Sequence, residues 1–196
     1  RHREEGNTVA TRQLNMIRGE VERSDMILTE LMGYARLSEG RVEKIDMKEE
    51  LQGAIEEAFP PNHAFHIQLK KDLHEGLPPL MMQRAHLREI MVNLLVNARE
   101  AAGENGIVQV SCRPSPQYAI ELRVKDSGDG IPLDQREQIF EAYFTTKKKG
   151  TGLGLAIVKQ NTELYGGEIV VESELGVGTE FILTFPTRVL LQKNES

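Results

Sequence analysis

Residues 83–102 read QRAHLREIMVNLLVNAREAA. Six apolar residues recur at helical spacing on one broad face, which predicts an amphipathic helix over 83–102. They are Leu87, Ile90, Met91, Leu94, Leu95 and Ala98. Asn93 and Asn97 lie one turn apart on the same side, although asparagine is a mediocre helix former. Each offers a carbonyl oxygen of the kind that Mg²⁺ accepts, but such a pair alone is more often structural.

The chain downstream of this helix predicts strands and one further helix. Residues 107–113 and 118–125 alternate apolar and polar, which predicts a hairpin, and 169–172 with 179–185 predict a second one through Gly176 and Gly178. A helix is expected from about Gly152 to Tyr165.

Upstream, 46–58 predicts a helix with Asp46 as N-cap, and Phe65 to Lys70 predict a half-buried strand. Residues 8–37 predict one long helix with a narrow apolar stripe at alternating spacings of three and four. This stripe favours a helical bundle or coiled-coil dimer over packing on the helix's own domain. The expected fold class is therefore α+β, with a mostly antiparallel sheet and a long N-terminal helix.

Composition excludes several classes of function. The 196 residues carry a net charge of −6, which argues against non-specific nucleic-acid binding. The sequence contains no run of about 18 apolar residues, so we expect no membrane contact by this chain. Cys112 is the only cysteine, so disulfide scaffolds and cysteine metal sites within one chain are excluded, and we expect it to be a strand residue.

Residues 126–132, DSGDGIP, follow a predicted strand directly. Asp126 would be a carboxylate at the strand end, able to accept a hydrogen bond from an exocyclic amine. Gly128 and Gly130 would let the backbone approach a flat ligand closely, although an ordinary Asp-Gly turn explains the pattern equally well.

Residues 147–155, KKKGTGLGL, run into the last predicted helix. Three alternating glycines leave backbone N–H groups free to face phosphates, and the N-terminus of the helix favours anions. The pattern is neither GxGxxG nor GxxxxGK[ST], and it favours phosphate binding over a flexible linker.

Taken in this order, the three motifs resemble the N, G1 and G2 boxes of the histidine kinase catalytic domain, in the GHKL ATPase superfamily. Residues 140–147, FEAYFTTK, look like its F box, and 176–181, GVGTEF, resemble its closing hairpin. The resemblance covers about residues 45–187. It implies a two-layer α/β sandwich of the Bergerat type, with three helices on one face of the sheet.

The resemblance also implies roles for residues. Asn97 would coordinate Mg²⁺ with help from Asn93, Asp126 would read the adenine amino group, and Lys147 would reach the terminal phosphates. The nucleotide-binding residues expected are Asn93, Asn97, Arg99, Asp126, Gly128, Gly130, Ile131, Phe144, Lys147, Gly150, Thr151, Gly152, Leu153, Gly154, Leu155 and Thr179. Asn93 and Lys147 are the expected catalytic residues, and Arg99 is the only candidate for a further basic phosphate contact. Phe140 and Phe144 are either anchors of the glycine-rich lid or simple core residues.

The same resemblance divides the chain into three parts. Residues 1–44 look like the second helix of the dimerisation and phosphotransfer hairpin, 45–189 are the ATP-binding domain, and 190–196 are a tail. No His-Glu/Asp-x-x-x-Pro motif is present, so the phosphoacceptor helix is expected to be absent. His2 has no proline at the right spacing, and the other four histidines are expected to be surface or packing residues: His63, His66, His74 and His86.

The expected function is therefore the ATP-binding core of a sensor histidine kinase, with ATP and Mg²⁺ as cofactors. A start at Arg1 indicates a piece of a longer protein. Because the phosphoacceptor histidine is expected to be absent, the chain alone is expected to lack autophosphorylation. Expected partners are a second copy of the chain and the receiver domain of a response regulator, and the expected location is the cytoplasm.

Two alternatives stay open at this point: a GHKL ATPase clamp and a nucleotide-gated scaffold. The clamps use a glutamate base four residues before the metal-binding asparagine, where this chain has Asn93. Glu89 lies two turns before Asn97 and is a poor substitute.

Overall fold

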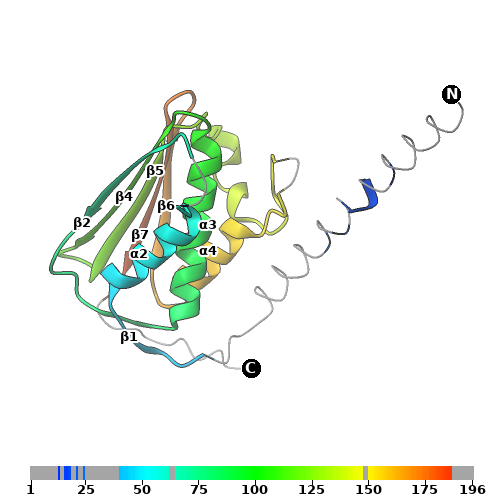
Figure 1. Ribbon diagram of the computed structural model, residues 1–196. Coiled ribbons are helices and arrows are strands. Elements are labelled where there is room, and N and C mark those ends of the chain that lie inside the picture. Colours follow the sequence, from blue (N-terminus) through cyan, green and yellow to red (C-terminus); the bar gives the residue numbers. More distant parts are fainter. Residues whose placement is uncertain are drawn as a thin grey trace, which may run out of the picture.

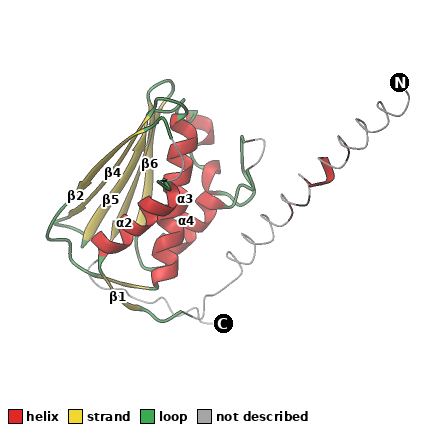
Figure 2. Ribbon diagram, viewed as in Figure 1, coloured by secondary structure: helices red, strands yellow, loops and turns green. Residues whose placement is uncertain are grey.

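The computed structural model describes residues 13, 16–18, 21, 24, 40–61, 65–147 and 150–186. In residues 40–186 of this part, a twisted sheet forms one layer and three helices cover one of its faces (Figure 1). The helices are α2 (Met47–Ala58), α3 (Arg84–Ala102) and α4 (Gly154–Leu164). The two layers are separated clearly when the chain is coloured by secondary structure (Figure 2). This arrangement confirms the expected α+β sandwich.

The main sheet has the strand order β2-β4-β5-β7-β6. These strands are β2 (Gln68–Leu73), β4 (Ile107–Pro114), β5 (Ile120–Asp126), β7 (Gly178–Phe185) and β6 (Glu168–Glu174). The β4–β5 and β6–β7 pairs are antiparallel hairpins, as predicted, whereas β2 pairs with β4 in parallel. In the β5–β7 register Asp126 is the partner of Thr179, which joins two predicted site residues at one end of the sheet.

Parts of the fold differ from the prediction. The strand expected from Phe65 begins at Gln68, because its parallel partner β4 begins at Ile107, opposite Gln68. β1 (Glu43–Ile45) and β3 (Leu80–Met82) form a small antiparallel sheet that the sequence did not predict. Strands of three residues are too short to display a clear alternation. Two 3₁₀ turns, η1 (Leu133–Gln135) and η2 (Gln138–Phe140), lie between β5 and α4, where the sequence predicted no helix or strand.

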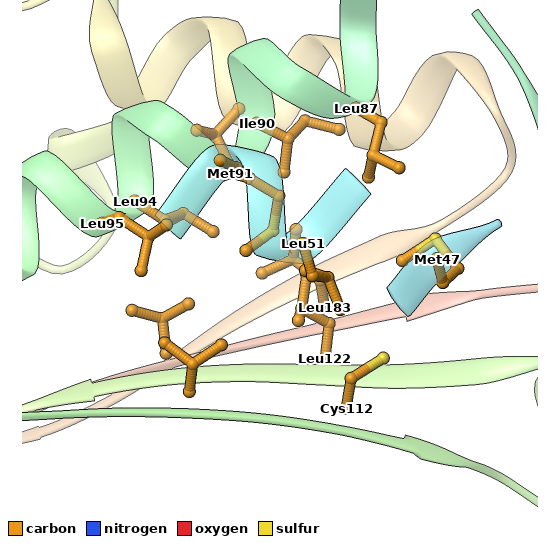
Figure 3. Packing of buried hydrophobic residues seen from close by; sticks show 14 of the residues in the cluster. Met47, Leu51, Leu87, Ile90, Met91, Leu94, Leu95, Cys112, Leu122 and Leu183 are labelled. Atoms are coloured by element: carbon orange, nitrogen blue, oxygen red, sulfur yellow. The ribbon is translucent and has the colours of Figure 1, made fainter. Parts of the chain in front are cut away.

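The helices form where the sequence predicted them because local signals and burial agree. The Asp46 side chain accepts hydrogen bonds from the backbone N–H groups of Lys48 and Glu49, at 2.9 and 3.2 Å, and so caps α2. The six apolar residues predicted for α3 are all buried against α2 and the sheet, as Figure 3 shows for five of them. Ile45 of β1 is also fully buried in this core, so the packed domain includes β1.

Cys112 lies within β4 and is fully buried in the core, as expected (Figure 3). Burial raises the pKa of its thiol to about 12. Since the thiolate is the reactive form, we expect Cys112 to resist alkylation in the folded chain and to react rapidly once urea unfolds it. The check is the rate of modification by iodoacetamide at pH 8 with and without denaturant. Equal rates would contradict the burial of this thiol.

The predicted long helix over 8–37 falls mostly outside the described residues. The positions described within it, 13, 16–18, 21 and 24, are helical. His2, His63, Lys148, Lys149 and the expected tail over 190–196 also lie outside the described residues. Within the described part, no helix has the length and apolar character needed to cross a membrane.

Candidate nucleotide-binding site

A cavity of about 760 Å³ opens between α3, the loop after β5 and the segment that leads into α4. Thirteen of the sixteen residues predicted to bind nucleotide line it. They are Asn93, Asn97, Asp126, Gly130, Ile131, Phe144, Lys147, Gly150, Thr151, Gly152, Gly154, Leu155 and Thr179. Three motifs that are far apart in the sequence therefore meet around one space, which is large enough for a small-molecule ligand.

The asparagine pair forms one wall of the cavity. The Asn93 side-chain amide donates a 2.9 Å hydrogen bond to the Glu89 backbone carbonyl, which fixes its orientation on α3. Its carbonyl oxygen then faces Gly154, where an added Cβ would lie only 2.9 Å from it. The Asn93 oxygen is thus directed toward the glycine-rich segment rather than into the apolar core.

The Lys147 side chain contacts this wall of the cavity. Its Nζ donates to Asn97 Oδ1 at 2.9 Å and to Glu100 Oε2 at 2.5 Å. The Lys147 and Glu100 side chains are 42% and 47% exposed, so a ligand entering the cavity can reach both. The ammonium group already lies among the oxygens where the resemblance expects metal and phosphate.

Asp126 lies at the end of β5, where it is 4% exposed. Burial raises the pKa of its carboxyl group, and hydrogen bonds from the backbone N–H groups of Gly128 and Thr179 oppose that rise. The Gly128 bond measures 2.8 Å. A carboxylate held by its neighbours' backbone in this way presents its acceptor oxygens in a fixed direction.

A small hydrogen-bond network supports the same end of the cavity. Ser173 Oγ accepts a 2.7 Å hydrogen bond from the Ile131 backbone N–H and donates one of 3.0 Å to the Gly178 carbonyl. It also lies 2.9 Å from Thr179 Oγ1. The Arg136 guanidinium also donates to the Ser173 carbonyl. β6 therefore fixes the loop after β5, although neither Ser173 nor Arg136 belonged to a recognised motif.

The glycine-rich segment closes the cavity from the α4 side. The Tyr143 backbone N–H donates to the Gly152 carbonyl at 3.0 Å, and Gly152 has a φ of +74°. A Cβ at Gly152 would lie 2.4 Å from the Tyr143 carbonyl carbon, so no other residue fits without movement of the backbone. Gly154 begins α4 and lines the cavity, so the N-terminus of an eleven-residue helix adjoins it.

Three predicted residues do not line the cavity. The Arg99 guanidinium donates to the Ala58 carbonyl at the end of α2 and lies 4.7 Å from the centroid of the Phe65 ring, so it is directed away from the site. A Cβ added at Gly128 would lie 2.5 Å from the Ala101 carbonyl oxygen, and Leu153 is fully buried. Phe140 packs edge-on against Phe181, whereas Phe144 lines the cavity.

The cavity also contains residues that sequence reasoning missed. They are Val96, Glu100, Ala101, Asp129, Pro132, Gln135, Ile139, Thr145, Thr146, Leu175 and Phe181. Val96 and Glu100 follow from the helical period, since they lie beside Asn97 on α3 and line the same cavity. Gln135 and Leu175 reach the cavity only through the tertiary fold, and no local sequence signal marks them.

The residues present fit a nucleotide with a magnesium ion. Among the described residues no group of three or more histidine, cysteine, aspartate or glutamate side chains could hold a metal by itself. Mg²⁺ needs no such group when phosphate oxygens and water complete its octahedron, and one or two protein oxygens then suffice. Asn97 Oδ1 and Asn93 Oδ1 are oxygens of this kind.

Fold and site together define a nucleotide-binding domain of the α/β sandwich class, and comparison with known families agrees. Residues 82–189 match the family described as "Histidine kinase-, DNA gyrase B-, and HSP90-like ATPase", and this match covers more than half of the chain. The chain belongs to this family.

Similar proteins within this family include sensor histidine kinases. The sensor histidine kinase ZraS of Escherichia coli K12 is 32% identical over 170 residues, which cover 87% of this chain and 36% of ZraS. The nucleotide-free catalytic domain of histidine kinase ThkA superposes with a TM-score of 0.68 and 28% identity, over 76% of this chain and 97% of that domain. Full-length ShkA in complex with AMPPNP superposes with a TM-score of 0.72 and 30% identity, over 82% of this chain and 35% of ShkA. The predicted histidine kinase catalytic domain is thereby confirmed, in a chain that spans about a third of the length of ZraS.

Proposed function

We propose that this chain binds ATP with Mg²⁺ in the cavity and transfers the γ-phosphoryl group to a histidine on a dimerisation hairpin. The observation that carries the proposal is the meeting of Asn97, Asp126 and Gly152 around one cavity. Phosphoryl transfer needs positioning and charge neutralisation more than covalent help from the protein. The ShkA complex with AMPPNP is consistent with a nucleotide in a site of this fold.

At the phosphate end, the proposal gives each polar group one task. Asn97 Oδ1 and Asn93 Oδ1 would hold the metal ion, whose chemistry is to neutralise charge on the phosphoryl oxygens. The Lys147 ammonium would exchange its present contacts for the terminal phosphates. Backbone N–H groups of residues 150–154 and the N-terminus of α4 would bind the remaining phosphate oxygens.

At the adenine end, Asp126 would accept a hydrogen bond from the exocyclic amine. Ile131 and Phe144 line the cavity and offer apolar surface to the base. Thr179 lies within hydrogen-bonding distance of Ser173 and would support the Asp126 carboxylate from β7. This end would give the preference for adenine, whereas the phosphate end would give the chemistry.

A hydrolytic ATPase clamp is not favoured, because the cavity lacks a carboxylate where a general base would be needed. Asn93 occupies the position of that base and cannot accept a proton. The Glu89 carboxylate accepts a 2.8 Å hydrogen bond from Asn161 between α3 and α4, and Glu89 does not line the cavity. Site geometry therefore favours transfer to a separate acceptor over attack by water.

The remaining features of the proposal concern the whole protein. We propose that residues 1–42 belong to a dimerisation and phosphotransfer hairpin and that two copies pair through this helical segment. The catalytic domain would then run from 43 to 189 rather than from 45, because β1 pairs with β3. A response regulator receiver domain would take the phosphoryl group onward. A solved complex of histidine kinase ThkA with the response regulator TrrA has the same fold, with a TM-score of 0.71 and 23% identity.

The decisive experiment for this function is a transfer assay. The chain is mixed with γ-labelled ATP, Mg²⁺ and a polypeptide carrying the complete dimerisation hairpin of the parent protein. We expect acid-labile, base-stable label on a histidine of the hairpin and little label on this chain alone. Rapid release of inorganic phosphate without any labelled histidine would contradict the kinase and support the clamp.

A further inference from the structure

Glu100 is the one acidic side chain of α3 that lines the cavity. Its carboxylate contacts the Lys147 ammonium at 2.5 Å, and the same ammonium contacts Asn97 Oδ1 at 2.9 Å. Two oxygens from neighbouring turns of one helix therefore converge on a single cationic centre. The position of Lys147 Nζ shows that this corner of the cavity holds a positive charge.

The needs of the helix do not account for this glutamate. Glu100 lies in the last turn of α3, which ends at Ala102, and an acidic side chain there is unfavourable beside the negative end of the helix dipole. Its ion pair with Lys147 is about half exposed, and such a pair contributes little to stability. The carboxylate also faces a cavity that is proposed to take a polyanionic triphosphate, which it would repel.

We infer that Glu100 makes the site select nucleotide complexed with a divalent cation over free nucleotide. This inference rests on the proposed function. In the nucleotide-free chain the Lys147 ammonium satisfies the carboxylate. When the Lys147 ammonium moves to the phosphates, Glu100 has no other ion-pair partner in the described part of the chain, so a divalent cation beside Asn97 would be its counter-charge. A metal-free nucleotide therefore brings its own negative charge next to an uncompensated carboxylate, whereas a metal complex supplies the missing cation.

Two roles of Glu100 can be distinguished experimentally: discrimination between metal-bound and metal-free nucleotide, and simple positioning of Lys147. If Glu100 only held Lys147 in place, its removal would change the affinity for both forms of nucleotide by the same factor. If Glu100 discriminates between them, its removal changes the two affinities unequally. The informative quantity is therefore the ratio of the two dissociation constants, metal-free over metal-bound.

The test is calorimetric titration of the chain with AMPPNP, once in excess Mg²⁺ and once in EDTA. Glu100→Gln keeps the size of the side chain and removes its charge. We expect this substitution to lower the ratio about tenfold, through tighter binding of free AMPPNP and weaker binding of its magnesium complex. The Mg²⁺ concentration that gives half-maximal AMPPNP binding should rise in parallel. Glu100→Lys, which reverses the charge, should lower the ratio further.

Glu172→Gln is the matched control, because Glu172 is exposed on β6 and does not line the cavity. It should leave the ratio at the wild-type value, and circular dichroism should show all variants folded. A wild-type ratio in both Glu100 variants would overturn the inference and leave the proposed function intact. A wild-type chain that binds AMPPNP under neither condition would instead contradict the proposed function.

Discussion

Replacing Asp126 with asparagine is expected to weaken ATP binding by at least about a hundredfold while the domain stays folded. Asp126 Oδ1 already accepts the Gly128 N–H bond. An asparagine that keeps this bond would turn its NH₂ group toward the cavity, where the adenine amine is also a donor. Two buried donors would then face each other, so the substitution removes a bond and leaves both groups unpaired.

The effect of this change on stability should be small. Because burial raises the pKa of Asp126 in the folded chain, its ionisation opposes folding as the pH rises through that raised pKa. Asparagine removes this cost but also weakens the backbone bonds to the carboxylate, so we expect a change of less than about 1 kcal/mol in the free energy of unfolding. Urea denaturation at pH 7 measures it.

The role of Asp126 can be tested more specifically by changing the base of the nucleotide. ITP carries a carbonyl oxygen where ATP carries the amine, so the asparagine NH₂ would bond it. Calorimetric titrations should show that Asp126→Asn reduces the preference for ATP over ITP. Asp72→Asn is the control, since Asp72 is an exposed β2 residue paired with Arg113. An unchanged ATP affinity in Asp126→Asn would remove Asp126 from the site.

Replacing Gly130 with alanine is expected to destabilise the domain by about 3 kcal/mol or more. Gly130 has a φ of +76°, which alanine tolerates poorly, and its Cβ would lie 2.2 Å from the Glu174 carbonyl oxygen. The same Cβ would lie 2.7 Å from the Glu174 carbonyl carbon and 3.0 Å from Leu175 Cα. All three are backbone atoms of the β6–β7 hairpin, so no side chain can rotate to relieve the clash.

Gly176 in the same hairpin gives the matched control. Its φ is +75°, almost the same as that of Gly130, but no atom lies within 4 Å of an added Cβ. Gly176→Ala should therefore cost only the conformational strain, about 1 kcal/mol. The difference between the two variants in urea denaturation isolates the steric contact. Equal losses would contradict the close approach of the loop to β6.

The sequence predicted those parts of the fold that short-range chemistry determines. α3, a helix of nineteen residues, could be located because apolar residues recur in it at helical spacing from Leu87 to Ala98, and α2 could be located because Asp46 caps it. β1 and β3 were missed because each has three residues, and a strand that short is defined by its partner. The parallel pairing of β2 with β4 likewise depends on tertiary packing.

In the site, too, the residues that could be predicted were those marked by the local sequence. Asn93, Asn97, Asp126 and Lys147 could be predicted because they stand in motifs with unusual local composition. Arg99 shows the limit of that reasoning, since its proximity to Asn97 in sequence does not bring it to the cavity. On a helix a shift of two positions turns a side chain through about 200°, toward α2 and Phe65. Glu100 was not among the residues predicted to bind nucleotide, although its position on α3 turns it toward Lys147.

The central claim is that a magnesium nucleotide binds where the asparagine pair, the Asp126 turn and the glycine-rich segment meet. The most direct measurement is the change in backbone amide chemical shifts of the labelled chain as AMPPNP is added with Mg²⁺. The account predicts that the largest changes fall together on Asn97, Asp126 and Gly152, and that they saturate at one equivalent. Saturable binding whose shifts map to another face, with these three amides unmoved, would contradict it.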